Sequence, residues 1–139
     1  DSTLVDAGVE ALESNPNADS AVTVTEMNMY SPLRARRLDD SGYLKPFVPF
    51  DAIGDPNTLN SERDSQGNVY YADMSHSVVR TKWLDKMDQG LLPQLWMGQN
   101  ILPIPNIYGC DLDFRWQIST TEWWLREKGF TKTSTPYDK

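Results

Sequence analysis

The feature that most constrains the fold is the run from Ser20 to Glu26, which reads Ser-Ala-Val-Thr-Val-Thr-Glu. It alternates apolar and polar residues and is rich in β-branched side chains, a pattern typical of a β-strand. Residues 3–13 precede it and place their apolar side chains at helical spacing, as the inner stripe of an amphipathic helix. That stripe consists of Leu4, Val5, Val9 and Leu12. Because Asn15-Pro16-Asn17 ends the helix, the helix, turn and strand form an αβ unit.

Size and charge limit the classes of protein that this chain can be. With 139 residues, 39% of them hydrophobic, we expect one α/β domain over residues 1–130 and a polar tail over 131–139. The net charge of −7 disfavours nucleic-acid binding, which needs a basic face. The sequence shows no signal peptide and no apolar run near the ~20 residues of a membrane span, so no membrane partner is expected. Cys110 is the single cysteine, which favours a cytoplasmic location.

Residues 27–60 lack regular periodicity and are predicted to form a projecting arm. Asp39-Asp40-Ser41-Gly42 is a turn signal between two short extended stretches, which indicates a β-hairpin. Apolar residues between prolines follow it and suggest packing on a partner chain. These residues are Phe47, Val48, Phe50 and Ile53. The basic cluster of Arg34, Arg36 and Arg37 is interpreted as an ordinary surface or subunit contact in preference to a phosphate clamp.

The next segments alternate strand and helix signals. Residues 69–72 and 77–80 are both strand-like and are separated by Asp73-Met74-Ser75-His76. Thr81 is predicted to cap a helix from Lys82 to about Gln89. The side chains expected to face inward from that helix are Trp83, Leu84 and Met87.

In the last third of the chain, residues 101–104 are predicted to be extended. A final helix is predicted from about Gln117 to Lys128, ending at Gly129. The residues available to cap its start are Ser119, Thr120 and Thr121.

Two residue types have both a functional and a structural interpretation. His76 is the only histidine, and a structural, hydrogen-bonded role is favoured over that of a catalytic base. Trp116, Trp123 and Trp124 have the size and shape to stack on a base or a sugar ring. At helical spacing they are interpreted as core or interface anchors.

The stretch Ile107–Phe114 carries the strongest chemical signal, the pair Asp111 and Asp113. On a strand, residues two apart project from the same face, so the two carboxylates would lie side by side. Because like charges held this close are costly without a cation, the pair predicts a Mg²⁺ site. The alternative is a solvated strand end or turn. The pair precedes the last helix, and ligands of open α/β sheets bind at such junctions.

Several segments, taken in order, resemble the C-terminal two-thirds of the acylneuraminate cytidylyltransferase (CMP-sialic acid synthetase-like) family. The resemblance covers about residues 3–128. The segments that carry it are residues 18–26, 40–47, 69–71, 78–80 and 101–103, followed by Asp111-Leu112-Asp113.

The resemblance implies part of a three-layer, Rossmann-like nucleotidyltransferase fold with a protruding dimerisation hairpin. Members join CTP to an acid sugar and release pyrophosphate. By this likeness Asp111 and Asp113 would hold Mg²⁺, and Arg63 and Tyr71 would contact the substrate. The chain would act as a homodimer, and the interface residues assigned by the likeness are Arg36, Tyr43, Leu44 and Phe47.

The sequence departs from the family pattern at several places. The family's N-terminal half, whose loop cradles CTP, has no counterpart here. Asp64 follows Arg63 where Gln is usual, Met74-Ser75 replaces an Asn-Gly, and Gln117 replaces the Asp that opens the last helix. No catalytic residue is therefore assigned. The alternatives are a half enzyme completed by another segment or chain, a non-catalytic dimerisation or binding domain derived from this fold, and a related glycosyltransferase.

Overall fold

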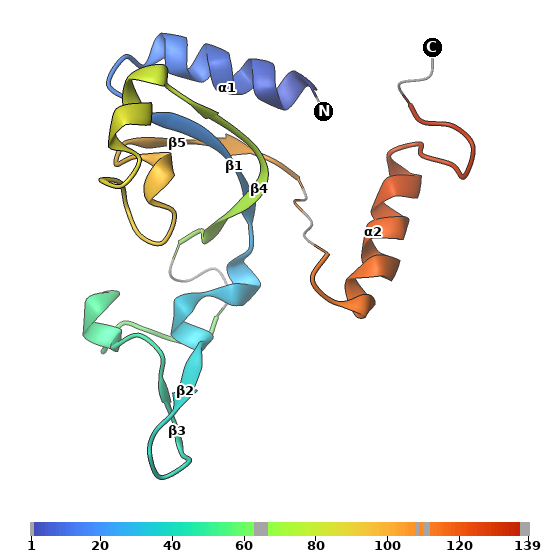
Figure 1. The fold of residues 1–139 in the computed structure, drawn as a ribbon. Helices are drawn as coiled ribbons and strands as arrows, with labels where there is room; N and C mark the ends of the chain where they lie inside the picture. Colours follow the sequence, from blue (N-terminus) through green and yellow to red (C-terminus); the bar gives the residue numbers. More distant parts are fainter. Residues whose placement is uncertain (1, 63–66, 108, 110–111, 137–139) are drawn as a thin grey trace.

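A computed structural model of the chain describes residues 2–62, 67–107, 109 and 112–136. It has a mixed α/β fold, with one mixed three-stranded sheet and one two-stranded sheet (Figure 1). The strand order of the larger sheet is β4-β1-β5. The helices and strands are α1 Ser2–Ser14, β1 Ser20–Glu26, β2 Arg36–Leu38, β3 Leu44–Pro46, β4 Tyr70–Val79, β5 Ile101–Pro105 and α2 Arg115–Glu127.

The predicted strand over residues 20–26 is confirmed as β1, the central strand of the sheet. It pairs parallel to β5 and antiparallel to β4, so that Ser20 lies opposite Ile101 on one side and Val79 on the other. Because β1 has a strand on each side and both of its faces are covered, it is buried along most of its length. Its alternation of Val and Thr therefore places both residue types in the interior.

The predicted N-terminal helix is confirmed as α1, which covers one face of the sheet. Leu12 joins Ala18, Ala21 and Ile104 in the core. The predicted inner stripe is right for Leu4 and Leu12 and wrong for Val5 and Val9, which are exposed; the small residues Ala7, Gly8 and Ala11 face the sheet in their place. The reason is a close approach of the helix to β4. A Cβ atom on Gly8 would lie 2.8 Å from Val78 Cγ2.

The opposite face of the sheet is covered by the segment 81–100, which contains two 3-10 helices, η4 (Thr81–Lys86) and η5 (Leu95–Met97). Trp83 and Met97 are buried there, and the Ser20 hydroxyl donates a hydrogen bond to the Met97 carbonyl.

The helix predicted from Lys82 to Gln89 is thus a shorter 3-10 helix that follows Arg80, and Thr81 does not cap it. Leu84 and Met87 are exposed rather than inward-facing. At three residues per turn, these two share a side that Trp83 does not occupy.

The side chain of Arg80 fastens the end of α1 to the end of β4. Its guanidinium donates to the carbonyls of Leu12, Asn15 (3.3 Å) and Ala18 (2.9 Å). The last carbonyls of a helix lack partners within the helix and carry partial negative charge. The half-buried Arg80 guanidinium therefore satisfies this helix end and fixes its position on the sheet.

The two strands predicted at 69–72 and 77–80 form the single strand β4. The residues between them make a bulge, since the register passes from Val22 opposite Ser77 to Val24 opposite Ala72. Met74 takes a left-handed conformation with φ of 59°. Extra residues on one strand are accommodated in this way without ending the pairing.

The predicted hairpin is confirmed as β2 and β3, and it projects away from the main sheet (Figure 1). Asp39 Oδ1 accepts hydrogen bonds from the amides of Ser41 (3.0 Å) and Tyr43 (2.8 Å). Gly42 supplies the positive φ of 82° that closes the turn. The side chains predicted to form a dimer surface, those of Arg36, Tyr43, Leu44 and Phe47, are all exposed.

The predicted extended piece at 101–104 is confirmed as β5, which forms one edge of the sheet. The backbone amide of Asn106 donates to the carbonyl of Val24, so the backbone amides of the even-numbered residues of β5 point toward β1. Pro103 and Pro105 therefore occupy positions whose backbone nitrogen points away from β1, toward the open edge of the sheet.

The strand predicted for the aspartate pair is wrong for the described residues. β5 ends at Pro105, and none of the described residues from Asn106 to Phe114 lies in a strand or helix. After Pro105 the main chain leaves the parallel pairing with β1, and no other strand of the described chain pairs with it.

The predicted last helix is confirmed as α2, but it begins two residues earlier, at Arg115. The Phe114 amide donates to Gln117 Oε1 (2.6 Å), which makes the first turn. The residues predicted as caps, Ser119, Thr120 and Thr121, therefore lie inside the helix. Its predicted end is confirmed, since Gly129 has a φ of 85°.

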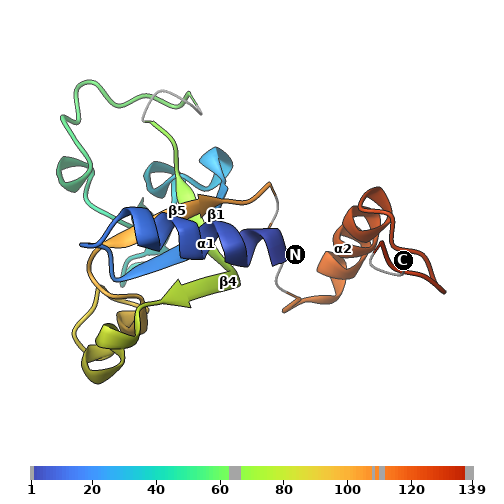
Figure 2. The ribbon, with the colours of Figure 1, turned by 90° about the horizontal axis from the view of Figure 1, so that it is seen from above.

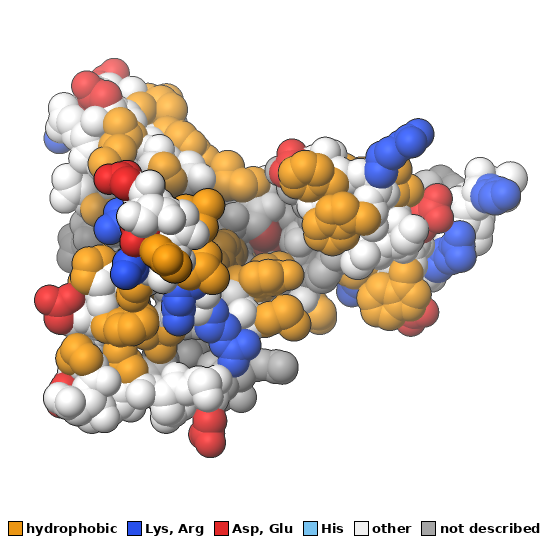
Figure 3. All heavy atoms as spheres, turned by 90° about the horizontal axis from the view of Figure 1, so that it is seen from below, with side chains coloured by type: hydrophobic (Ala, Val, Ile, Leu, Met, Phe, Trp, Pro, Cys, Tyr) orange, Lys and Arg blue, Asp and Glu red, His pale blue; other side chains and the backbone are white. Residues whose placement is uncertain are grey.

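The helix α2 stands apart from the sheet in both ribbon views (Figures 1 and 2). All of α2 is described, and none of its residues is buried. The tryptophans were predicted to be core or interface anchors, and the core alternative is wrong for Trp116 and Trp123, which are 69% and 60% exposed. Hydrophobic side chains accordingly lie on the surface of the lobe that α2 forms (Figure 3). Among the described residues, no helix is long and apolar enough to cross a membrane.

Candidate functional site

The candidate site lies where the parallel strands β1 and β5 end, on the face of the sheet that carries α1. Thr23 and Thr25 are two residues apart on β1 and therefore project from the same face as Ala21, which packs under α1. Asp73 reaches this face from the bulge of β4. Asn106 arrives from the residue that follows β5.

Asp73 is the centre of a hydrogen-bond network that joins all three strands. Its Oδ1 accepts from Thr23 Oγ1 (2.6 Å) and from the Ser75 amide (3.0 Å). Its Oδ2 accepts from Thr25 Oγ1 (2.9 Å) and Asn106 Nδ2 (3.0 Å). A carboxylate oxygen has about two good acceptor positions, so both oxygens of Asp73 are fully engaged. Its role is therefore to hold the strands together rather than to bind a ligand.

The ionisation of Asp73 follows from this network. Partial burial raises the pKa of the carboxyl, but hydrogen bonds from Thr23, Ser75 and Thr25 outweigh it, and the pKa lies below its ordinary value of 3.8. The site thus contains a fixed negative charge at neutral pH.

Gly109 connects this network to the segment that carries the aspartate pair. Its amide donates to Thr25 Oγ1 (2.9 Å). A side chain at this position would overlap Asp73, since a Cβ atom would lie 2.6 Å from Asp73 Oδ2 and closer still to its Cβ and Cγ. Only glycine fits so close to the carboxylate. The chain is therefore anchored at the carboxyl ends of β1 and β5, four residues before Asp113.

The predicted metal ligands are only partly placed. Asp113 is exposed and lies in the irregular segment just before α2, whereas Asp111 lies outside the described residues. Whether the two carboxylates face the same way thus remains a prediction. Among the described residues, no group of three or more His, Cys, Asp or Glu side chains lies together as a metal site would. An exposed carboxylate is nevertheless the kind of ligand that Mg²⁺ takes, with water at its other positions.

The predicted substrate contacts lie away from Asp113 in the sequence, and only one is described. Arg63 lies outside the described residues. Tyr71 is on β4, where its hydroxyl donates to the Tyr30 carbonyl (2.8 Å) and its ring meets that of Tyr30 edge to face, at a centroid distance of 6.4 Å. This contact joins the sheet to the base of the hairpin arm. A substrate role for Tyr71 stays a prediction.

The basic cluster on the arm does not converge on one point. Arg34 donates to the Ser61 carbonyl (2.9 Å). Arg36 donates to the carbonyls of Leu33 (2.6 Å) and Ala35 (2.9 Å), and its guanidinium lies 5.7 Å from the centre of the Phe50 ring. These contacts agree with the surface interpretation and do not form a phosphate clamp.

Sequence reasoning did not find Thr23, Thr25, Asp73 and Asn106 as a site. His76, in the same bulge, accepts at its carbonyl from Thr23 Oγ1 (3.0 Å) and donates its amide to the same oxygen (3.0 Å), so its main chain has a structural role. One signal was present in the sequence: two threonines spaced for one face of a buried strand, where a polar partner is required.

A concavity lies away from this network, at the amino ends of β1 and β5. Its volume is about 400 Å³, and it is lined by Ser14, Asn15, Pro16, Asn17, Ala18, Asn100, Ile101 and Leu102. It contains no charged side chain among its lining residues.

Asp19 shapes the chain beside this concavity. Its Oδ2 accepts from the amides of Gln99 and Asn100, both at 3.0 Å, and Gly98 packs against the same side chain. The Asn100 amide is the main cause that places the pKa of Asp19 below 3.8, against an opposing effect of burial. Its role is structural, like that of Asp73.

No family model matches the chain, and no curated protein matches it.

Proposed function

We propose that this chain is the C-terminal part of a Mg²⁺-dependent cytidylyltransferase that joins CTP to a sialic-acid-like acid sugar. The observation that carries the proposal is the anchoring of Gly109 on Asp73 and Thr25. It fixes Gly109, two residues before Asp111 in the sequence, at the carboxyl ends of two parallel strands. Open α/β folds bind nucleotides at this end of the sheet, which supports the proposal.

Asp111 and Asp113 are the residues that would hold the metal. Mg²⁺ bound there would neutralise charge on the α-phosphate of CTP. In the overall reaction a sugar hydroxyl oxygen bonds to the α-phosphorus, the bond from that phosphorus to the bridging oxygen breaks, and pyrophosphate leaves. In this reaction the chain would hold the acidic segment in place through Gly109. It would also keep Asp73 ionised, with both of its oxygens already hydrogen-bonded within the protein. Asp73 thus does not compete for the cation.

The finer architecture belongs to the same proposal. The described part of the chain has one helix on one face of a mixed sheet and an irregular segment on the other. A complete three-layer nucleotidyltransferase would need further strands and a phosphate-binding loop, which the proposal assigns to residues outside this sequence.

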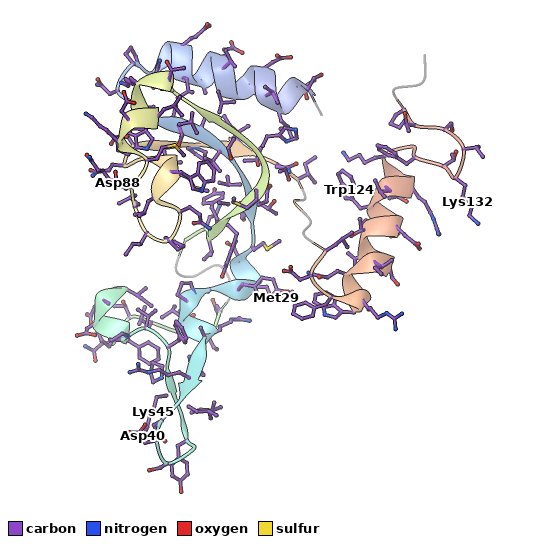
Figure 4. All side chains as sticks on the ribbon, viewed as in Figure 1. Met29, Asp40, Lys45, Asp88, Trp124 and Lys132 are labelled. Atoms are coloured by element: carbon purple, nitrogen blue, oxygen red, sulfur yellow. The ribbon has the colours of Figure 1, made fainter. Side chains whose placement is uncertain are left out.

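Titration calorimetry with Mg²⁺, alone and with CMP, tests the metal site. We expect Asp111→Asn and Asp113→Asn each to weaken Mg²⁺ binding at least about tenfold, because each removes a charged ligand. Asp40→Asn is the matched control, since Asp40 lies at the tip of the hairpin (Figure 4). If the two site variants bind Mg²⁺ as the unchanged protein does, the proposed metal site is wrong.

One observation favours a second function, a non-catalytic dimerisation domain. The hairpin exposes Leu38, Tyr43 and Leu44, each more than two-thirds exposed at 69%, 69% and 68%. Such a patch on a projecting element is typical of a subunit contact. Light scattering of Leu44→Asp against the unchanged protein tests it. A dimer that is lost in this variant, together with absent Mg²⁺ binding, would favour assembly over catalysis.

A further inference from the structure

The exposed face of α2 has a regular pattern of large and small side chains. Trp116 and Trp123 are seven residues apart, or about two helical turns, and so lie on the same stripe. Ser119 and Thr120, between them, are also exposed. The stripe thus reads large, small, small, large along the helix.

This order is the same in both directions, since two residues separate each tryptophan from the small pair. A surface with this property fits a second copy of itself turned by 180°. Each tryptophan of one helix then meets the other tryptophan of the partner helix, and the small pairs meet at the centre. Small residues at a crossing let two helices approach closely, while the aromatic rings fill the space on either side.

We propose that α2 is a self-association surface, which pairs antiparallel with α2 of a second copy of this chain about a two-fold axis near Ser119 and Thr120. A closed, symmetric pair uses the same patch on both subunits, so this surface needs no other partner. It is separate from the hairpin β2–β3.

The charges beside the stripe agree with the antiparallel direction. Arg115 and Glu122 are also seven residues apart, on one flank of the stripe. In an antiparallel pair, Arg115 of each helix lies near Glu122 of the other. Within one chain Glu122 contacts Arg126 at 3.5 Å, and both side chains are largely exposed. This weak surface pair costs little to rearrange.

The size of the contact sets the expected strength. A tryptophan buries about 150–250 Å² when fully covered, so four partly exposed rings supply less than the ~1,200 Å² of a standard interface. Association through α2 alone should therefore be weak, with a dissociation constant in roughly the micromolar range or above.

Sedimentation velocity of the chain over a range of concentrations tests the surface directly. We expect Trp116→Lys combined with Trp123→Lys to weaken the α2-dependent association at least tenfold. Leu92→Lys is the control, since Leu92 is an even more exposed apolar residue, at 82%, outside α2. Circular dichroism of each variant checks that α2 is still folded. Equal association of all three proteins would overturn the proposal.

Disulfide trapping tests the direction of the pair, in a Cys110→Ser background. Thr120→Cys lies near the axis and should cross-link to its own copy on mild oxidation, because disulfides need Cα atoms within about 7 Å. Lys128→Cys is the control, since in an antiparallel pair its copies lie about 25 Å apart. Cross-linking at both positions would indicate a parallel pair, and cross-linking at neither would exclude this surface.

The same trapping is repeated in Asp113→Asn. We expect no change in cross-linking there, whether or not Mg²⁺ binding is lost. Failure of the metal site and failure of the α2 contact can thus be told apart.

Discussion

The strand β1 and the helix α2 both contain large or branched apolar side chains, yet β1 is almost wholly buried whereas no residue of α2 is. The difference lies in what surrounds them. β1 has a strand on each side, α1 on one face and the segment 81–100 on the other. α2 follows β5 in the chain and stands apart from the sheet (Figure 1). Apolar composition alone thus does not say whether an element completes its packing within this chain.

The largest change in stability is expected in the part of the chain formed by the three-stranded sheet, α1 and the segment 81–100. Leu12→Ala removes a buried side chain from the core under α1. We expect it to lower the free energy of unfolding by about 3 kcal/mol, since such changes leave a cavity. Val9→Ala, on the exposed side of the same helix, is the control and should cost less than about 0.5 kcal/mol. Urea denaturation followed by circular dichroism measures both. Similar losses would mean that α1 is packed on another face.

A smaller effect is expected from the network that joins the three strands. Asp73→Asn replaces an acceptor oxygen by an amide group that cannot accept from Thr25 and Asn106. We expect a loss of about 2 kcal/mol, the usual cost of leaving partly buried donors without partners. Ser75→Ala removes the hydroxyl that also bonds Asp73 but keeps the backbone amide that donates to it, so this variant should cost clearly less than Asp73→Asn. Thermal unfolding at pH 7 gives the ranking, and an unchanged midpoint for Asp73→Asn would show that the network adds no stability.

The pH dependence of the unfolding free energy is expected to come from two carboxylates, those of Asp19 and Asp73. The folded-state pKa values of Asp19 and Asp73 lie below 3.8. The stability that they contribute is therefore complete at pH above about 4 and is lost as the pH falls through their folded-state values. Unfolding measured from pH 6 to pH 2 should show a fall at the acid end that is shallower in Asp73→Asn. The same slope in both proteins would argue against the ionised network.

The smallest effect is expected in α2, although it carries the largest side chains. Trp123→Ala should change the unfolding free energy of the dilute chain by less than about 0.5 kcal/mol, because the ring is already 60% exposed. At high concentration the same variant should unfold more easily than the unchanged protein, because the paired state is lost. Differential scanning calorimetry at two concentrations gives both comparisons. A large loss at low concentration would mean that α2 packs on its own body.

Local pattern was enough to predict the elements whose signals lie within a few residues. The helix and strand at the start, the Asp39–Gly42 turn and the last helix are set by periodicity, turn residues and a terminal glycine. The continuity of β4 was missed, because the bulge at Met74 depends on register with a strand about 50 residues away.

The candidate site was predictable only in part, for the same reason. Asp73 meets Thr23 and Thr25 across 50 and 48 residues of sequence, so no local spacing signals their contact. The exposure of Trp116 and Trp123 was likewise outside the reach of pattern, because an amphipathic stripe shows that a surface is apolar and not which molecule covers it. Gly109 could be noticed in the sequence, but its purpose depends on the Asp73 side chain beneath it.

The prolines of β5 determine how the sheet can grow. Pro103 and Pro105 stand in the outward row of this edge strand and have no amide hydrogen to offer a neighbour. A strand from another molecule finds almost no donors there, which guards this border against fibril-like stacking. The opposite border, along β4, keeps its amides. An added strand would therefore find fewer amide donors along β5 than along β4, where only the bulge around Met74 interrupts the ladder.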